Sequence, residues 1–274
     1  MTEAEMVPPG VDAATPSPAR LYDYYLGGTN NFQVDRDAAD RLRVLMPELS
    51  DAAWANRGFH QRAAIWMAEH GIRQFIDIGS GLPTRGNTHQ AVQKVDPAIR
   101  VLYVDYDPMV QAHARDLLAD DGSTKFILAD MRDPGALFGS PELRGDIDLA
   151  EPLGLLMTSV VHFVPDELDP WGLVASYARA IAPGSYLALS HATIDRLPPR
   201  MVQAGLELYE QASERLHPRT KAEVTRFFAG LELIPPYPAA EPEVTYVGMW
   251  GAEDPQAADS DGSRVLYCGV ARRP

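Results

Sequence analysis

Apolar and polar positions alternate along most of the chain in two rhythms, one typical of strands and one typical of helices. Short apolar runs that end in turn residues predict five strands, at 75–78, 101–104, 125–129, 153–158 and 185–189. Helix-start signals follow several of them, namely Asn87 with Gln90 three residues later, Asp107-Pro108 and Asp169-Pro170. This order of elements predicts an α/β fold with a mostly parallel sheet and helices on both faces.

The two ends of the chain have other patterns. Residues 1–19 are rich in proline and have little to bury, which predicts a disordered tail. Residues 20–70 predict three helices, at 21–26, 34–45 and 56–70, which we assign to a helical cap. Residues 71–274 form the predicted sheet domain. Its last two strands, 244–250 and 264–271, are joined by an acidic loop without a helix, which predicts an antiparallel edge.

Composition narrows the partners that we expect. The formal net charge of −14 disfavours nucleic acid and anionic membranes, because both require a basic face. The single cysteine, Cys268, excludes an internal disulfide and a thiolate metal cage, and no His, Asp and Glu set has metal-ligand spacing. No apolar run is long enough to cross a bilayer, and the N-terminus lacks the features of a signal peptide. We therefore expect a cytoplasmic protein without a metal.

The stretch "FIDIGSGLPTRGN", residues 75–87, reads as a buried strand that enters a turn with two glycines. Gly79 and Gly81 allow the backbone to turn sharply and to approach a ligand closely. A dinucleotide site would need a third glycine at position 84, where Thr84 stands, and Pro83 removes a backbone donor. On its own, the loop is equally consistent with an ordinary turn between a strand and a helix.

Three acids at predicted strand ends make a ligand site the better interpretation. Asp105 ends the second strand, where an acid that binds ribose hydroxyls is expected. Asp130 ends the third strand and is placed to accept from an adenine amine. Asp77 lies within an apolar strand, where a carboxylate requires a polar partner such as an ammonium group. The ammonium, ribose hydroxyls and adenine amine of S-adenosylmethionine match this set of acids better than a pyrophosphate does. Asp107, which precedes Pro108, is better explained as a helix N-cap.

Seven segments of the chain, in order, resemble a known family: "ARLYDYYLGGTNNFQVDRDAA", "ANRGFHQRA", "FIDIGSGLPTRGNTHQ", "VLYVDYDPMV", "ADMRDP", "SVVHFVPDE" and "PGSYLALSHAT". The chain is similar to bacterial S-adenosylmethionine-dependent methyltransferases over nearly all of 20–274, and more narrowly to a branch with the N-terminal motif YDYYLGG. The resemblance implies a class I, Rossmann-like, doubly wound sheet of seven strands with one antiparallel edge strand and a helical N-terminal cap. It also implies S-adenosyl-L-methionine as the cofactor, bound by Asp77, Gly79, Gly81, Asp105 and Asp130. The neighbouring residues at the strand ends, Ser80, Tyr106, Met131 and Ser159, complete the predicted cofactor site.

Methyl transfer needs an aligned nucleophile and, where that nucleophile is protonated, a general base. His162 and His191 follow the fourth and fifth strands and are the candidate bases, although a structural role would also explain each. We expect four polar residues of the cap, Tyr22, Tyr25, Asn30 and Arg57, to face the cofactor or the acceptor.

A small-molecule acceptor, methylated at oxygen or nitrogen, is the prediction that remains after elimination. After the fourth strand the chain reads Ser159-Val160-Val161-His162, not the acid or asparagine with two prolines typical of exocyclic-amine nucleic-acid methyltransferases. No cysteine follows this strand for covalent attack on a pyrimidine. Two alternatives stay open: a binding protein that keeps the cofactor but lacks catalysis, and a nicotinamide dehydrogenase, which Pro83 and Thr84 disfavour.

Overall fold

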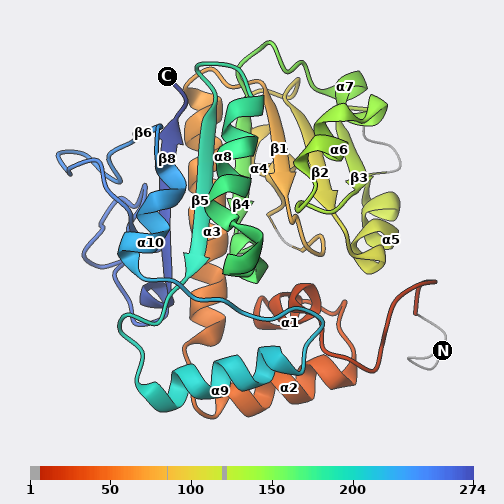
Figure 1. Cartoon of the computed structure of the whole chain (residues 1–274), viewed down its shortest axis with the longest axis vertical. Helices are drawn as coiled ribbons and strands as arrows, with labels where there is room; N and C mark the ends of the chain where they lie inside the picture. The colour runs from red at the N-terminus through yellow and green to blue at the C-terminus, as the bar shows by residue number, and fades with distance from the viewer. Residues whose placement is uncertain (1–6, 85, 119–121) are drawn as a thin grey trace.

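The computed structural model describes residues 7–84, 86–118 and 122–274, and its centre is a mixed sheet (Figure 1). Among these residues the sheet has eight strands, in the order β3-β2-β1-β4-β5-β8-β6, with β7 paired to β8 beside this path. Five strands run parallel, and β8 is antiparallel to β5. The mostly parallel, Rossmann-like sheet with one reversed strand is therefore confirmed. The strands are β1 (Gln74–Ile78), β2 (Arg100–Asp105), β3 (Thr124–Leu128), β4 (Gly154–Thr158), β5 (Tyr186–Ala192), β6 (Glu232–Leu233), β7 (Thr245–Tyr246) and β8 (Leu266–Arg272).

The predicted strand count of seven is wrong by one short strand. The two-residue β6 pairs with the outer side of β8. It contains no apolar run, so the sequence pattern did not predict it. The predicted strand 244–250 is reduced to the two-residue β7, because the chain turns at Gly248 and Gly251. Val247 and Trp250 in this turn are buried, so their apolar character reflects packing on the sheet and not strand pairing.

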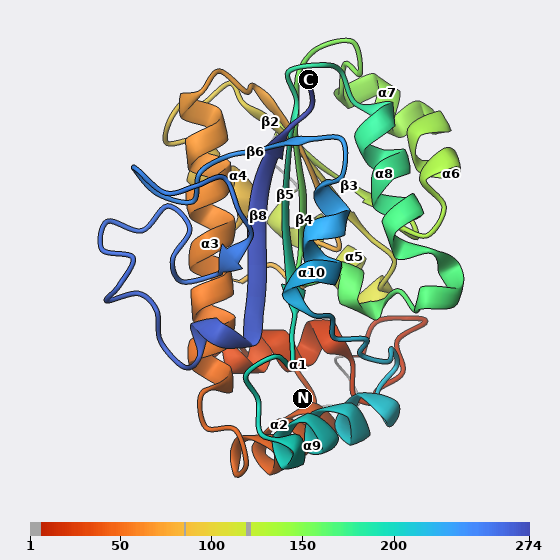
Figure 2. The same cartoon turned by 60° about the vertical axis from the view of Figure 1, so that its left-hand side comes forward.

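Alternate residues of each strand pack into two hydrophobic layers, one on each face of the sheet. Helices lie on both faces (Figure 2). On β1, Ile76 faces one layer with Tyr177, while its neighbour Phe75 faces the other with Met67. The first layer is covered by α6 (Pro134–Gly139), α7 (Pro141–Asp146) and α8 (Pro170–Ala180), and the second by α3 (Leu49–Glu69) and α4 (Thr88–Val92). The remaining helices of the sheet region are α5 (Pro108–Leu117) and α10 (Lys221–Thr225).

A separate layer of helices lies across the carboxyl ends of the parallel strands (Figures 1 and 2). It contains α1 (Pro18–Tyr25), α2 (Gln33–Arg43) and α9 (Pro199–Glu210), and α2 contacts α9. A buried ion pair between Arg20 Nε and Asp35 Oδ2, at 2.7 Å, joins α1 to α2. The predicted boundary at residues 70 and 71 does not divide the structure in this way, since α3 packs on the sheet and α9 belongs to the cap.

The prediction of a disordered tail to residue 19 does not hold for residues 7–19. Val7, Val11 and Ala13 pack against a small cluster that contains Met109 and Val110. The backbone N–H of Ser17 donates to Asp35 Oδ1 at 3.0 Å, so this segment is tied to the cap. Composition misses this because a few apolar residues suffice where the folded domain supplies the other side of the contact. Residues 1–6 lie outside the described residues.

Two of the predicted helix starts show their caps directly. The Asp107 side chain accepts from the Met109 N–H at 2.8 Å, and the Asn87 N–H donates to Gln90 Oε1 at 3.1 Å. Within the described part of the chain, no helix is both long enough and apolar enough to cross a membrane.

Candidate active site

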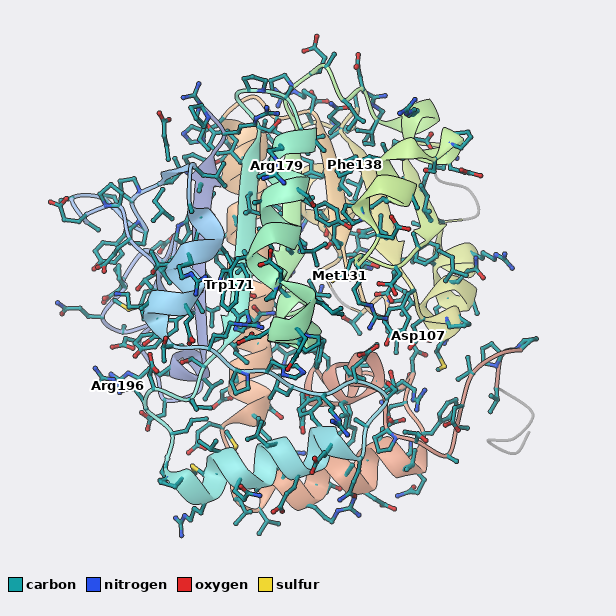
Figure 3. All side chains as sticks on the ribbon, viewed as in Figure 1. Asp107, Met131, Phe138, Trp171, Arg179 and Arg196 are labelled. Carbon is teal, nitrogen blue, oxygen red and sulfur yellow. The ribbon has the colours of Figure 1, made fainter. Side chains whose placement is uncertain are left out.

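A cavity of about 260 Å³ lies between the carboxyl ends of the strands and the cap helices. All but two of the predicted site residues line it, and the two exceptions are Asn30 and His191. Figure 3 shows Asp107 and Met131 at the strand ends that face α1, and Phe138 farther up, among the helices that cover the sheet. The predicted residues that line the cavity are Tyr22, Tyr25, Arg57, Asp77, Gly79, Ser80, Gly81, Asp105, Tyr106, Asp130, Met131, Ser159 and His162.

The glycine loop after β1 has the geometry that its sequence predicts. Gly79 and Gly81 have φ angles of +65° and +64°, in the left-handed region that favours glycine. A Cβ at position 79 would collide with the side chain of Val160, whereas one at position 81 would meet nothing within 4 Å. The loop is held to β2 because the Gly81 N–H donates to Asp105 Oδ2 at 2.9 Å. Gly79 therefore provides a close approach, and Gly81 provides an open wall.

Asp77 stands at the end of a chain of buried hydrogen bonds. Thr88 Oγ1 donates to Asp77 Oδ2 at 2.6 Å, and the His60 Nε2 lies 2.7 Å from the same Thr88 oxygen. The His60 Nδ1 lies 2.8 Å from Thr158 Oγ1, which lines the cavity. Because the Thr88 proton is given to Asp77, His60 must donate from Nε2 and accept at Nδ1. We call these four residues the Asp77 relay.

Burial sets the charge state of this relay. It raises the pKa of Asp77 to about 7, against the opposing hydrogen bond from Thr88. Burial also lowers the pKa of His60 to about 3, so this imidazole is neutral at physiological pH. His60 was not among the predicted residues, because a polar residue within a 21-residue helix gives no sign of which face it occupies. A buried carboxyl group with no cation paired to it makes Asp77 a receptive site for an ammonium group.

Asp105 is the second buried carboxylate of the site. Its Oδ2 accepts from Gly81, and its Oδ1 accepts from the Asp107 N–H at 3.0 Å. Burial nevertheless raises its pKa to about 6. Asp107 acts as the predicted helix N-cap and is also 3.3 Å from the Ser17 hydroxyl, which donates to it.

Asp130 does not have the free oxygens that the sequence analysis assigns to it. Arg132 donates to both of its oxygens, from Nε at 2.9 Å to each, from Nη2 at 2.8 Å and from the backbone N–H at 2.8 Å. Burial alone would raise the pKa of Asp130, but these hydrogen bonds outweigh it and lower the pKa. The Arg132 guanidinium lies 5.6 Å from the Tyr106 ring and 3.5 Å from Glu214. Asp130 therefore positions a planar cation beside Tyr106, and an adenine amine would have to displace Arg132 to reach it.

Arg57 is a buried cation that keeps free hydrogen-bonding capacity. It is 8% exposed, its Nη2 donates to Thr84 Oγ1 at 3.2 Å, and its guanidinium lies 5.6 Å from the Tyr22 ring. Its Nε has no partner among the described residues. An unpaired buried donor costs about 1–3 kcal/mol, so Arg57 is prepared to bind an anionic group.

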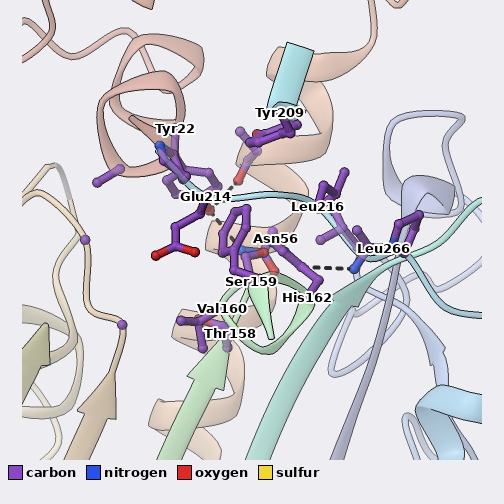
Figure 4. Close-up of a pocket in the computed structure, with 18 of the residues that line it drawn as sticks. Tyr22, Asn56, Thr158, Ser159, Val160, His162, Tyr209, Glu214, Leu216 and Leu266 are labelled. Atoms are coloured by element: carbon purple, nitrogen blue, oxygen red, sulfur yellow. Dashed lines mark hydrogen bonds between the residues drawn. The ribbon is translucent and has the colours of Figure 1, made fainter. Parts of the chain in front are cut away.

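A second network fixes the floor of the cavity around Ser159 (Figure 4). The Ser190 hydroxyl donates to Asn56 Oδ1 at 2.6 Å, Asn56 Nδ2 donates to the Tyr22 hydroxyl at 2.9 Å, and that hydroxyl donates to the Ala53 carbonyl at 3.1 Å. The Ser159 N–H donates to Ser190 Oγ at 2.9 Å. Ser159 has a φ of 54°, which is unusual for a residue other than glycine and is found most often at functional sites.

The two candidate bases have different places and different partners. His191 does not line the cavity: its Nε2 accepts from Arg219 Nη1 at 2.8 Å, so its Nδ1 donates to the Ala192 carbonyl at 2.8 Å. The predicted base role of His191 is therefore wrong, since both ring nitrogens are engaged within the fold. His162 does line the cavity, and its Nδ1 accepts from the Ala192 N–H at 3.2 Å. Burial lowers the pKa of His162 well below its usual value.

Of the remaining predicted residues, some line the cavity and one lies outside it. Asn30 lies outside the cavity, and its backbone N–H donates to Asp23 Oδ2 at 2.9 Å, so it serves the turn after α1. Met131 lines the cavity and is 8% exposed, and its carbonyl accepts from the Tyr177 hydroxyl at 2.9 Å. Tyr25 also lines the cavity, and its hydroxyl has no partner among the described residues. No three His, Cys, Asp or Glu side chains of the described ranges are grouped as metal ligands would be.

Comparison with known families identifies the kind of protein to which this cavity belongs. The family model described as S-adenosyl methyltransferase matches residues 4–274. The chain belongs to the S-adenosyl methyltransferase family. This member is therefore an S-adenosylmethionine-dependent methyltransferase, and the nicotinamide dehydrogenase alternative is wrong.

Solved structures agree with this family. The methyltransferase is 37% identical to a candidate methyltransferase from Thermobifida fusca YX, with a TM-score of 0.88 over 98% of each chain. It is 38% identical to a duf574 family protein from Streptomyces avermitilis MA-4680, with a TM-score of 0.87 over 96% of this chain and 99% of the other. An O-methyltransferase family protein from Burkholderia thailandensis shares the fold, with a TM-score of 0.51 at 14% identity over 87% of this chain and 58% of the other. No curated protein matches the chain in sequence.

The residues of this methyltransferase fit S-adenosylmethionine on observations of their own. Two carboxyl groups, Asp77 and Asp105, have raised pKa values because burial outweighs the hydrogen bonds that they accept, so each would be stabilised by a further polar or cationic partner in the cavity. The unpaired Nε of Arg57 suits the cofactor's carboxylate, which is its single anionic group. The open wall at Gly81 leaves room for the ligand against the backbone.

Proposed function

We propose that the enzyme methylates a small molecule at oxygen or nitrogen by in-line displacement. The observation that carries this proposal is the extent of the cavity, which continues past the acids of the cofactor site to an apolar region under α2 and α9. A protein that only bound the cofactor would not need this second compartment. The cap helices lie across this end of the sheet (Figure 1), and the net charge of −14 disfavours nucleic acid.

The cofactor is held, in this proposal, by residues from three strand ends and α3. Arg57 binds the carboxylate, Asp77 the ammonium group and Asp105 the ribose hydroxyls. Asp130 acts through Arg132, which forms an outer wall beside Tyr106. This assignment places the sulfonium end of the ligand near Ser159, between the glycine loop and the acceptor region.

The chain contributes alignment and exclusion of water, which are the main requirements of methyl transfer. When bound, the cofactor supplies an electrophilic methyl group on a sulfonium. The Ser190–Asn56–Tyr22 network holds the backbone at Ser159 in its unusual conformation, so the floor beneath the reacting atoms is rigid. The Tyr22 hydroxyl donates its proton to the Ala53 carbonyl, so Tyr22 positions neighbouring groups and does not donate to the acceptor.

Calorimetry tests the cofactor assignment directly. S-adenosylmethionine and S-adenosylhomocysteine are expected to bind, and NAD is not. Arg57→Gln should weaken S-adenosylhomocysteine binding about tenfold or more, because a buried charge-assisted bond is worth about 1.5–3 kcal/mol. The exposed Arg41→Gln serves as the control and should bind normally.

Mass spectrometry tests the transfer itself. Metabolites from cells with and without the enzyme should differ by species that carry one added CH₂. Normal cofactor binding with no such species, and no release of S-adenosylhomocysteine from any acceptor mixture, would favour a binding protein without catalysis.

A further inference from the structure

The part of the cavity beyond Ser159 forms a compartment of its own, which we call the acceptor chamber. Its walls come from the end of α2 and the turn after it, from the segment after β5, from α9 and from the loop that follows α9. They consist of the side chains of Leu42, Met46, Ile194, Met201, Leu206 and Leu216. Three rings, those of Tyr25, Phe163 and Tyr209, complete it, with Phe163 and Tyr209 at a centroid distance of 5.8 Å. Flat aromatic ligands pack well against walls of this kind.

The chamber contains no ionised side chain among the described residues that line the cavity. Every Asp, Glu and Arg of that lining belongs to the cofactor half, where Glu214, for example, pairs with Arg132 at 3.5 Å. The one histidine of the chamber, His162, is neutral at physiological pH because burial lowers its pKa. A carboxylate or ammonium group on the acceptor would lose its hydration here without compensation, at a cost of several kcal/mol.

Tyr25 and His162 each bring a polar atom without a partner into this apolar compartment. The Tyr25 side chain is 7% exposed, and its hydroxyl has no hydrogen bond to any described residue. The His162 Nε2 likewise has no partner in the described part of the chain, while its Nδ1 accepts from Ala192. The neutral imidazole must then carry its proton on Nε2. His162 can therefore donate a hydrogen bond to the acceptor, but it has no lone pair left with which to act as a base.

A site without a base restricts the nucleophile. An aliphatic alcohol would need a strong base to ionise, whereas a phenol ionises in water near pH 10 and needs only modest stabilisation of its oxyanion. The Nε2–H of His162 and the hydroxyl of Tyr25 are two donors of the kind that stabilise an oxyanion.

We propose that the acceptor is a phenol, apolar and uncharged apart from its reacting hydroxyl, held by His162 and Tyr25 and methylated on oxygen; this rests on the proposed function. The phenol loses its proton to water. A lone pair of the phenolate oxygen then forms the O–CH₃ bond, while the S–CH₃ bond breaks and its electron pair stays on sulfur. The products are a neutral aryl methyl ether and the neutral thioether S-adenosylhomocysteine.

The test uses the full chain saturated with S-adenosylhomocysteine and a matched set of ring compounds. Binding of 2-naphthol, of substituted neutral naphthols, of 2-naphthylamine and of 6-hydroxy-2-naphthoate is measured by calorimetry. At least one neutral naphthol should bind ten times or more tightly than its carboxylate counterpart. If no neutral naphthol binds, or if the carboxylate binds as well, the inference is overturned. If S-adenosylhomocysteine itself does not bind, the proposed function fails, so the two failures are distinguishable.

Variants then separate hydrogen bonding from folding. Tyr25→Phe keeps the ring and should weaken naphthol binding about tenfold while cofactor affinity stays constant. Its control on the same helix is Tyr24→Phe, whose hydroxyl bonds to Asp40, and naphthol binding should be normal. His162→Gln, which keeps an N–H donor, should lose less activity than His162→Leu.

The pH profile gives an independent reading of His162. With S-adenosylmethionine, the release of S-adenosylhomocysteine should rise with pH according to the acidity of each naphthol. An inflection that stays fixed across naphthols of different acidity and disappears in His162→Gln would identify a histidine base and overturn the proposal.

Discussion

Asp77→Asn should stabilise the cofactor-free enzyme and weaken its binding of the cofactor. The carboxyl group is buried in β1 and has no cation bonded to it. Among the described residues, its side-chain hydrogen-bond donor is the Thr88 hydroxyl at 2.6 Å. An asparagine can accept the same hydrogen bond through its amide oxygen and carries no charge to bury. The fold should therefore gain stability wherever Asp77 would be ionised.

The magnitude follows from the pKa of Asp77. Each pKa unit corresponds to about 1.4 kcal/mol, so a rise from 3.8 to about 7 destabilises the ionised form by at most about 4 kcal/mol. The folded protein binds the proton more tightly than the unfolded chain, so this contribution favours folding at low pH and is lost as pH rises through about 7. The gain in the variant should consequently grow by about 2 kcal/mol between pH 5.5 and pH 8.5.

Urea unfolding of the cofactor-free wild type and variant at these two pH values measures this growth. Asp130→Asn is the control: because Arg132 lowers the pKa of Asp130, this group is ionised in the folded and unfolded states at both pH values, so the variant should lose stability by an amount that does not change with pH. A stability difference between Asp77→Asn and wild type that does not change with pH would refute the assignment of a strained, buried carboxyl group. Calorimetry with S-adenosylhomocysteine on the same samples should show weaker binding by the variant.

Three further tests, which use five substitutions, examine the rigidity of the site, and each is checked by urea unfolding and calorimetry. Gly79→Ala should cost more stability than Gly81→Ala and should also abolish cofactor binding, because only the first adds a collision with Val160 to the strain of a positive φ; equal effects would contradict this. Ser159→Gly should stabilise the fold by up to about 1 kcal/mol, since glycine adopts the φ of 54° without strain, while Ser159→Ala should not. Thr88→Val should cost about 1–3 kcal/mol, as it leaves both of its partners in the Asp77 relay unpaired, and a smaller loss than in an exposed threonine would argue against the relay.

The sequence was sufficient to predict which residues lie at the strand ends. It was insufficient to predict which residues of other elements face them. Parallel strands bring their carboxyl ends to one edge, so Asp77, Asp105 and Asp130 could be placed together from the pattern alone. The direction in which each side chain points could not be predicted from the pattern. Ser190 and His191 are adjacent on β5, and alternation sends the first toward Asn56 and the second toward Phe227, on opposite faces of the sheet.

Residues on helices were harder still to predict. Asn56 and His60 lie on α3, whose sequence shows no clear division into polar and apolar faces, because one end lies under the cap and the rest lies against the sheet. Their roles depend on partners more than twenty-five positions away, Thr88 for His60 and Ser190 for Asn56. Glu214, between α9 and α10, reaches the site only because the chain crosses back over it, and no local pattern encodes that crossing.

The polarity of the two halves of the cavity also bears on the rate of the reaction. In the cofactor half, hydrogen bonds fix nearly every polar group, and the free donor is Arg57 Nε. In the acceptor chamber, Tyr25 and His162 keep donors without a partner among the described residues, and none of the described side chains there is ionised. A phenolate and a sulfonium lose their charges as the methyl group moves, so the transition state carries less charge than the reactants. Apolar walls raise the energy of the separated charges more than that of the transition state, which lowers the barrier. A neutral amine would only pass the positive charge from sulfur to nitrogen, so no charge would be cancelled and the same walls would lower its barrier much less. The absence of charge in the chamber therefore favours a phenolate over an amine.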